Sequence, residues 1–315
     1  MKKHNGVALI TALLVTAIAT VAAVSMMSRQ HLDVRRSSNI YAADQAWLFT
    51  QGVESWAMKV LQRDRNDNRS DHLGEDWATV LPPISVEGGV VAGKLEDLQG
   101  RFNLNNLVND DGASQTDIET LKRLFDVLDI DSRRVQAIVD WVDKDEEMSF
   151  PDGAEDNVYL GREPAYRTAD RFMADPSELL LIDGIKFEDY QKLRPFVCAL
   201  PERTMVNVNT APAELLQALV PGLEAGDAEQ LLGEREDQPF ESVDDFRSNA
   251  LVDKYLHNNP ALDGQKNSKN GMTVSSDFFL LTAAAQYGQA EIYLASVIAR
   301  DEAGTRVIMH GQGEY

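Results

Sequence analysis

Cysteine is almost absent from this chain of 315 residues. Cys198 is the only one, so no disulfide can form within the chain, and a small buried apolar role is expected for it. The sequence also lacks a Gly-x-Ser-x-Gly motif, a glycine-rich phosphate loop and any Cys/His spacing that suits a metal. We therefore predict that the protein is not an enzyme.

Positive charge is scarce as well. The chain has 30 Lys and Arg against 51 Asp and Glu, which gives a formal net charge of -21. Such a chain repels phosphate backbones and gains nothing from counterion release, which argues against nucleic acid as a partner. Hydrophobic residues make up an ordinary 43%, so the chain can build cores, and its length suits about two domains.

The longest uncharged stretch lies at the N-terminus, from Val7 to Met27. As a helix it spans roughly 30 Å, enough to cross the hydrocarbon core of a bilayer. Lys2 and Lys3 precede it, so the positive-inside rule places the N-terminus in the cytoplasm and everything after Arg29 outside. The stretch predicts a single membrane span with a large external body.

Three interpretations of this N-terminus remain open from the residues alone. A secretory signal peptide would have a shorter apolar region followed by a small-residue cleavage site. A plain membrane anchor explains the length and the lysines but not the abrupt start after a basic segment ending in glycine. The third interpretation is a type IV prepilin-like leader, residues 1–6, cut between Gly6 and Val7 so that Val7 becomes the new N-terminus.

The rest of the chain predicts an α+β protein. The helical period continues to Leu61 and ends in a polar tract, residues 63–70, expected as a loop. Strand-like segments flank a helical middle at 111–256, and together they predict an antiparallel meander. Their ranges are 84–86, 90–98, 277–286, 289–300 and 305–310. A stretch rich in Asn, Gly and Lys at 257–275 predicts a loop or linker.

The helical middle contains an internal echo. Segments 102–105 and 206–209 introduce its two halves, and each half has a helix ending in an apolar-Gly-apolar turn, at Gly184 and at Gly222. This outline is that of helix-hairpin-helix units. Such units bind DNA through backbone N–H groups at the glycine turn, but here carboxylates such as Glu224 and Asp227 would surround a phosphate. A packing module for protein contact is favoured over DNA binding.

The densest group of carboxylates lies in segment 140–156. Hard oxygen donors on a flexible loop suit Ca²⁺, although the spacing is not that of an EF-hand. A merely solvated acidic loop and a catalytic metal centre are the alternatives, and the lack of histidine in the group disfavours catalysis. The candidate ligands are Asp140, Asp143, Asp145, Glu155 and Asp156.

Taken together, the leader ending at Gly6, the long helix, the acidic segment, segment 206–212 and the terminal strands resemble the K-type minor pseudopilin of type II secretion systems (general secretion pathway protein K). The resemblance covers essentially the whole chain. It implies a pilin-like fold, with a long N-terminal helix packed on an antiparallel sheet, and a large inserted α-helical domain with helix-hairpin-helix/SAM-like units. The implied division is a leader (1–6), a transmembrane part (7–27), a first pilin-like part (28–110), the insertion (111–256), a linker (257–275) and terminal strands (276–315).

The resemblance also implies a function and a location. The leader would be removed by the prepilin peptidase, with N-methylation of Val7, and the chain would be anchored in the inner membrane by one span with its body in the periplasm. There it would join minor pseudopilins of types I, J and H at the tip of a periplasmic pseudopilus on the inner-membrane secretion platform, and help to initiate its assembly. Structural Ca²⁺ is implied on the acidic segment. The alternatives are a membrane-anchored helix-hairpin-helix protein for DNA uptake and a metal-dependent hydrolase.

One departure from the general pilin pattern concerns position five of the mature chain. Most pilins have Glu there, whereas this chain has Thr11. The carboxylate is thought to pair with the N-terminal ammonium of the subunit above, which offsets the cost of burying the charge. A subunit with nothing above it has no such partner, so Thr11 fits a position at the tip.

Overall fold

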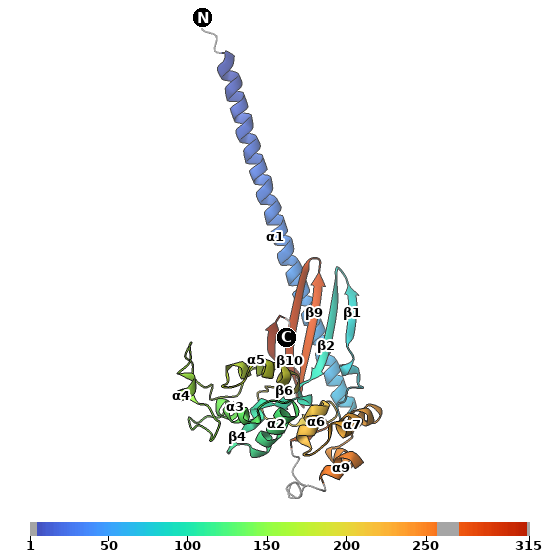
Figure 1. The fold of residues 1–315 in the computed structure, drawn as a ribbon. Helices are drawn as coiled ribbons and strands as arrows, with labels where there is room; N and C mark the ends of the chain where they lie inside the picture. The colour runs from blue at the N-terminus through green and yellow to red at the C-terminus, as the bar shows by residue number, and fades with distance from the viewer. Residues whose placement is uncertain (1–4, 257–270, 314–315) are drawn as a thin grey trace.

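The computed structural model describes residues 5–256 and 271–313, with side chains from residue 7 onward. One long helix rises from a body in which a sheet lies beside the helix and shorter helices gather at the end farthest from the N-terminus (Figure 1). The helices are α1 (Asn5–Asp67), α2 (Gln115–Val127), α3 (Val135–Val142), α4 (Asp156–Tyr159), α5 (Phe187–Leu193), α6 (Ala213–Leu219), α7 (Ala225–Asp237), α8 (Val243–Ser248) and α9 (Ala250–Leu256).

The described strands and 3-10 helices complete the element order. The strands are β1 (Leu81–Val86), β2 (Gly89–Asp97), β3 (Phe102–Asn103), β4 (Val108–Asn109), β5 (Gly112–Ala113), β6 (Val197–Cys198), β7 (Val206–Asn207), β8 (Met272–Thr273), β9 (Phe278–Tyr287), β10 (Ala290–Asp301) and β11 (Gly304–Gln312). The 3-10 helices are η1 (Asp76–Ala78), η2 (Leu98–Gly100), η3 (Leu104–Leu107), η4 (Ser132–Arg134), η5 (Pro176–Leu181) and η6 (Arg194–Phe196).

Five antiparallel strands form the main sheet in the order β1-β2-β9-β10-β11. The first two strands and the last three come from opposite ends of the chain, and β2 and β9 join them in a continuous register from Gly89 opposite Tyr287 to Asp97 opposite Phe279. The predicted meander is therefore confirmed. Pro82 and Pro83 lie in β1, an edge strand, where a missing N–H costs no ladder bond.

The second half of α1 packs on one face of this sheet. Ala57 and Leu61 are fully buried in the same cluster as Phe279, Leu281 and other apolar residues of the strands. This spacing of four places the small and apolar side chains on one face of the helix. From residue 7 to residue 40 every described side chain of α1 is exposed, and α1 is the one described helix long and apolar enough to cross a membrane.

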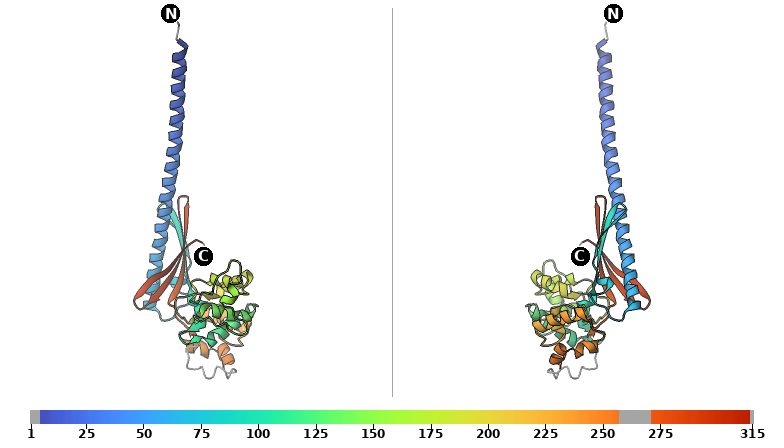
Figure 2. Two further views of the ribbon diagram at one scale, coloured as in Figure 1. Left: turned by 90° about the vertical axis from the view of Figure 1, so that its left-hand side faces the viewer. Right: turned by 90° about the vertical axis from the view of Figure 1, so that its right-hand side faces the viewer.

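The helices that follow form a second unit, which we call the helical lobe (residues 98–256 with β8). It lies at the far end of the sheet, on the side opposite α1 (Figure 2). Its own core is the largest hydrophobic cluster of the described residues, and a smaller apolar cluster that includes Leu98, Cys198, Leu280 and Val297 joins it to the sheet. Cys198 is buried there, as predicted, and burial raises the pKa of its thiol to about 12.

The internal echo predicted in the helical lobe corresponds to a repeated hydrogen-bond pattern. The amide of Asn105 donates to the carbonyl of Met173 and accepts from its N–H, at 3.0 and 2.8 Å. Asn209 makes the same pair of bonds with Phe240, both at 2.9 Å. Each asparagine thus fastens the start of one half of the lobe to a loop farther along the chain, which satisfies buried backbone groups.

Both helix-hairpin-helix turns are present. Gly184 and Gly222 have φ angles of +77° and +87°, a left-handed conformation that glycine adopts without steric cost. Gly222 joins α6 to α7 as expected. In the first unit the segment before the glycine is the 3-10 helix η5 rather than an α-helix.

Two predicted loops differ from the structure. The polar tract at 63–70 is helical as far as Asp67, where Arg63 and Asp67 form an i,i+4 ion pair of 3.5 Å. In the linker predicted at 257–275, residues 257–270 lie outside the described residues, but Met272 and Thr273 form β8 and pair with β7. Residues 1–4 of the predicted leader also lie outside the described residues, and Asn5 and Gly6 begin α1.

Candidate metal centre

The acidic segment begins at the end of α3 and folds back on itself through Asp140. This side chain is fully buried, and its carboxylate accepts hydrogen bonds from the backbone N–H groups of Ser149 (3.1 Å) and Ala154 (2.8 Å). Gly153 makes this approach possible, because a Cβ there would lie 2.2 Å from Oδ2 of Asp140. Asp140 therefore closes the loop that brings the later carboxylates back to the helix end.

Two of the predicted ligands, Asp143 and Glu155, lack partners for their buried oxygens. Oδ1 of Asp143 and both carboxylate oxygens of Glu155 find no hydrogen-bond donor among the described residues. Burial, and then the negative charges of Asp145 and Asp140, raise the pKa of Asp143 to about 7. Burial is also the main cause that raises the pKa of Glu155 to about 7, and the charge of Asp170 adds to it.

Asp170 belongs to the same group and was missed by the sequence analysis. Its Oδ1 is buried without a partner, and its charge raises the pKa of both Asp143 and Glu155. The residue has a φ of +48°, which Asp tolerates better than most residues. It lies 15 residues beyond Glu155, outside the dense run of acids, so no local pattern in the sequence marks it.

The other two predicted ligands point to different partners. Asp145 is exposed, and one of its oxygens accepts from the N–H of Glu147 at 2.8 Å. Asp156 accepts from the N–H and the hydroxyl of Thr168 and pairs with Arg167 at 3.1 Å. Asp145 remains near enough to raise the pKa of Asp143, whereas the carboxylate of Asp156 is occupied by protein groups.

The donor set suits a hard divalent cation. Asp143, Glu155 and Asp170 lie near enough for their charges to raise the pKa of Asp143 and Glu155, and buried charges are costly unless something pairs with them. Calcium takes six to eight oxygen ligands from flexible loops, whereas zinc prefers nitrogen and sulfur. The oxygens without partners on Asp143, Glu155 and Asp170 therefore have the chemistry that Ca²⁺ prefers. Within the described residues, however, the carboxylate oxygens that all lie within 4.8 Å of one another belong to a different group, Asp64, Asp71 and Glu75.

A second acidic group lies where α1 ends. Asp64, Asp71 and Glu75 are near enough together to hold a metal in principle. Arg300 pairs with Asp64 at 2.8 Å and with Asp71 at 2.5 Å, and Glu75 accepts from Trp77 at 2.7 Å. Because protein donors already satisfy these oxygens, this group is a buried ion-pair network rather than a metal centre.

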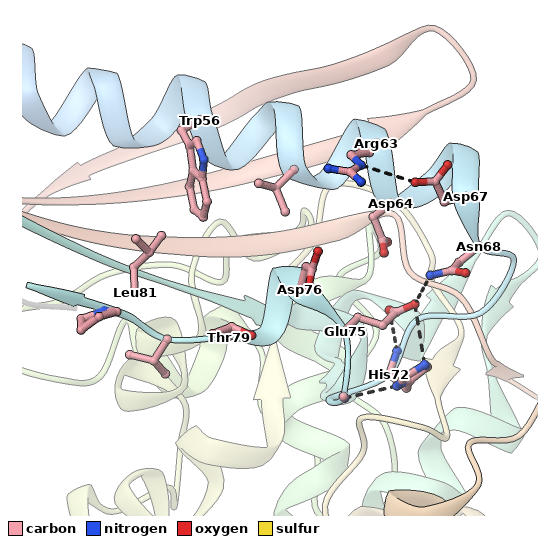
Figure 3. Close-up of a pocket in the computed structure, with 14 residues that line it drawn as sticks. Trp56, Arg63, Asp64, Asp67, Asn68, His72, Glu75, Asp76, Thr79 and Leu81 are labelled. Carbon is pink, nitrogen blue, oxygen red and sulfur yellow. Dashed lines mark hydrogen bonds and ion pairs between the residues drawn. The ribbon is translucent and has the colours of Figure 1, made fainter. Parts of the chain in front are cut away.

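An open cavity of about 730 Å³ lies beside this network, between the end of α1, the following loop and the start of β1. Trp56 and Leu81 line its apolar end, and Asp67, Asp76 and His72 line its polar end (Figure 3). Among the described residues that line it, no nucleophilic side chain is paired with a general base. The cavity is a mixed polar and apolar recess on the flank of the long helix.

The helix-hairpin-helix turns offer no phosphate site within the described residues. At the first turn, a Cβ on Gly184 would lie 2.4 Å from the guanidinium of Arg134, so a protein side chain already covers the glycine. The helix after the second turn begins with Glu224 as its N-cap and has Asp227 in its first turn. Negative charge at this position opposes an anionic ligand.

The predicted processing residues lie at the exposed beginning of α1. Val7 is 61% exposed, and Gly6 precedes it in the first turn of α1. The hydroxyl of Thr11 donates to the carbonyls of Val7 and Ala8, at 3.1 and 3.0 Å. Thr11 therefore satisfies its own polar group within the helix, as a hydroxyl in an apolar environment must.

Comparison with known proteins identifies the family. A family model described as "Type II secretion system (T2SS), protein K" matches residues 100–202 and 206–270. A protein of Pseudomonas aeruginosa named Type II secretion system protein K is 36% identical, over 99% of this chain and 93% of its own length. The chain belongs to the type II secretion system protein K family. Relatives of the same name from Aeromonas hydrophila and Klebsiella pneumoniae are 32% and 31% identical, over 98% and 99% of this chain and 96% and 98% of their own lengths.

A solved structure supports the fold of this protein K family member. The crystal structure of the GspK-GspI-GspJ complex from enterotoxigenic Escherichia coli contains a chain that superimposes with a TM-score of 0.78. That chain is 28% identical, and the match covers 89% of this chain and 99% of the other. The fold is thus pilin-like with a large helical domain, and the family is a component of the secretion system, consistent with a minor pseudopilin.

Proposed function

We propose that this minor pseudopilin forms the tip of the periplasmic pseudopilus together with minor pseudopilins of types I, J and H, and helps to initiate its assembly on the inner-membrane platform. The similarity to a chain crystallised with GspI and GspJ supports the first two partners. The role is structural rather than catalytic. No observation favours the nucleic-acid alternative.

The position of the helical lobe is the observation that carries this proposal. The lobe lies at the end of α1 and of the sheet that is farthest from the N-terminus (Figures 1 and 2). In a filament of parallel α1 helices, a bulky lobe at that end obstructs a subunit stacked above. Thr11 supports the same position, since a Glu with no subunit above it would be an unpaired charge in the bilayer.

The tip position can be tested with assembled pseudopili. Gold-labelled antibody against the helical lobe should mark one end of each filament, and label along the shaft would contradict the proposal. The variant Thr11→Glu should enter the membrane less readily, since it places an unpaired carboxylate within the apolar span. Thr11→Ser is the matched control and should behave as the parent chain.

We also propose that prepilin peptidase cuts between Gly6 and Val7 and that Val7 becomes N-methylated. The mature chain would then be held in the inner membrane by residues 7–27, with the body in the periplasm. The abrupt start of the apolar run after a basic segment supports this processing. Mass spectrometry of the chain from cells with an active peptidase should find methylated Val7 first, and a retained leader would contradict it.

Calcium is proposed as the structural ion of the acidic loop. Asp143, Glu155 and Asp170 would hold it with oxygens that lack other partners, and Asp140 and Asp145 lie close enough to contribute charge. Bound Ca²⁺ supplies positive charge that offsets carboxylate repulsion. The residues of this chain do the rest: Asp140 shapes the loop, and Asp156, through Thr168 and Arg167, fastens the segment that leads to Asp170.

A thermal unfolding series in detergent tests the calcium proposal. With a Kd of about 10⁻⁴ to 10⁻³ M, 10 mM Ca²⁺ should stabilise the chain by about 1.4 to 2.7 kcal/mol, and a chelator should remove this gain. Asp143→Asn and Glu155→Gln should lose most of the response. Asp126→Asn, a change at an exposed acid on α2, is the matched control. An unchanged calcium response in the first two variants would exclude this site.

A further inference from the structure

The segment of α1 between the apolar run and the sheet carries three arginines that no protein group uses. We call Arg29, Arg35 and Arg36 the arginine stripe. All three are exposed, and none makes a hydrogen bond or an ion pair with another residue in the described ranges. Only Asp33 and Asp44 oppose them in residues 28–44, whereas the chain beyond Asp44 has 25 basic and 49 acidic residues. The stripe is thus a local positive site on an acidic protein.

The stripe lies on the body side of α1. An α-helix turns by about 100° per residue, so all three arginines fall within about 60° of the mean direction of the buried positions of α1, which are Ala46, Thr50, Glu54, Ala57 and Leu61. A neighbouring helix packed on the uncovered side of α1 would not reach them. The stripe therefore points into the space between the membrane and the top of the sheet, rather than toward a helix bundle.

Its height along the helix places it at the membrane surface. At 1.5 Å per residue, Arg29 lies about 3 Å beyond Met27, and Arg36 about 14 Å beyond it. The headgroup layer is roughly 5 to 7 Å thick on each side, and long arginine side chains can bend back toward it. The sheet begins about 21 Å beyond Met27, where Tyr41 contacts Tyr287 with ring centroids 6.0 Å apart. Nothing in the described body therefore separates the stripe from the headgroups.

The charge distribution along the sequence makes these arginines unexpected. Lys2 and Lys3 precede the span, but three arginines follow it within ten residues. By the positive-inside rule, basic residues on the outer side work against the orientation of the chain. These arginines oppose the orientation of the chain and have no protein partner. A ligand that binds them on the outer side of the membrane would account for their presence.

We infer that the arginine stripe binds phosphate groups of anionic phospholipids at the outer surface of the membrane. Each arginine near such a surface contributes about a fivefold change in binding, from roughly 1 kcal/mol each. The contact would fix how far residues 28–40 of α1, the exposed segment between the apolar run and the sheet, project from the bilayer. The inference rests on the proposed membrane anchorage of the chain.

Full-length protein in phospholipid vesicles tests the inference. Ser37→Cys, which lies off the stripe, would carry an environment-sensitive fluorophore, since Cys198 is only 3% exposed and is protected from labelling. Raising phosphatidylglycerol from zero in phosphatidylcholine vesicles should shift the emission to the blue, and 0.5 M salt should reverse the shift. Arg29→Gln should raise the phosphatidylglycerol content needed for half of the emission shift by about fivefold. Replacing all three arginines should abolish the shift.

The matched control replaces Lys59, Arg63 and Arg69 by Gln. These changes remove the same charge from exposed positions at the far end of α1 and just beyond it, and they should leave the shift intact. An equal shift in the triple stripe variant, or none in the parent chain, would overturn the inference. If the parent shows no shift but the stripe variant loses binding to type I or type J pseudopilin, the stripe is a protein interface instead. Protease protection reports separately whether the chain spans the vesicle, so a failed anchorage is recognised as such.

Discussion

Replacing Arg300 should be the most damaging single change in the sheet. Arg300 lies near the end of β10 with 2% of its surface exposed. Its guanidinium donates to Asp64, Asp71 and the carbonyls of Leu61 and Ser276, at 2.5 to 3.2 Å. It also lies over the ring of Phe279, 4.7 Å from the centroid. One side chain therefore connects the end of α1, the loop after it and the start of β9.

The expected cost follows from what the replacement leaves behind. Arg300→Met keeps an apolar stem but leaves Asp71 and Asp64 buried without their cation, with side chains only 4% and 9% exposed. Removing one partner of a buried pair typically costs 3 to 5 kcal/mol. We expect a loss of about that size at pH 8, measured by urea unfolding in detergent with tryptophan fluorescence.

The loss should depend on pH in a defined direction. Burial raises the pKa of Asp71 to about 7 even with Arg300 present, and the nearby charge of Asp97 adds to this. Removing the cation raises the pKa of Asp71 further. At pH 5.5 this carboxyl is protonated in the folded variant, so the loss should shrink to about 1 to 3 kcal/mol, the cost of unmade hydrogen bonds.

Two further variants test whether the charge of Arg300 is the cause of the loss. Arg306→Met removes a surface arginine that pairs with Asp301, both largely exposed, and should cost less than about 1 kcal/mol. The double variant Arg300→Met/Asp71→Asn should recover part of the loss at pH 8, because one of the two stranded charges is gone. A loss below about 1 kcal/mol for Arg300→Met at pH 8, or the same loss at both pH values, would show that the network is not held by this charge.

Three other predictions concern single positions. In the parent chain the folded state keeps the proton of Asp71 at pH values where the unfolded chain has released it. The contribution of Asp71 to the free energy of unfolding therefore falls as the pH rises from about 4 to about 7. Urea titrations of the parent and of Asp71→Asn across this range should isolate the pH dependence that is due to Asp71. Gly153→Ala should loosen the acidic loop and weaken the calcium response in thermal unfolding, because its Cβ would collide with the carboxylate of Asp140, and an unaltered response would contradict the proposed role of that loop. Ser242→Ala should cost about 1 kcal/mol in urea unfolding, since the hydroxyl caps α8 by accepting from a backbone N–H at 3.0 Å; Ser242→Asp, which can still cap, should cost less.

Much of the fold was predictable because it depends on local signals. The uncharged run from Val7 to Met27 and the spacing of four between Ala57 and Leu61 each specify helix without knowledge of the rest of the chain. The same holds for the N-cap at Ser242 and for Gly184 and Gly222, whose turns require a left-handed backbone. The strand pairing between distant ends followed from alternation and turns, although the register was not predictable from the residues.

The candidate site was only partly predictable, since ligands converge from separate segments. The dense run from Asp140 to Asp156 indicated hard oxygen chemistry, but it did not separate Asp143 and Glu155, with free oxygens, from Asp156, whose carboxylate is occupied. Asp170 lies beyond the run and reaches the site only through the fold of the intervening loop. Composition thus predicts only a kind of ion, whereas burial and hydrogen bonding decide which carboxylates are available.

The junction between the main sheet and the helical lobe was not predictable from the sequence. Its hydrogen bonds bear on how the two units move together. Oδ2 of Asp97, at the end of β2 where the helical lobe begins, accepts from Asn207, Thr210 and Ser276 at 2.6 to 3.1 Å. Asn207 and Thr210 lie midway through the lobe, and Ser276 lies where the chain returns to the sheet, so one buried carboxylate holds three widely separated segments.

An apolar contact of similar size could slide with little loss, because hydrophobic burial has no preferred direction. Hydrogen bonds to a desolvated carboxylate are directional and costly to break one at a time. The same network continues through Ser276 to Asp71 and Arg300 and so to the end of α1. A force on the helical lobe is therefore transmitted to the long helix through fixed bonds, as the proposed position at the tip of the pseudopilus would require.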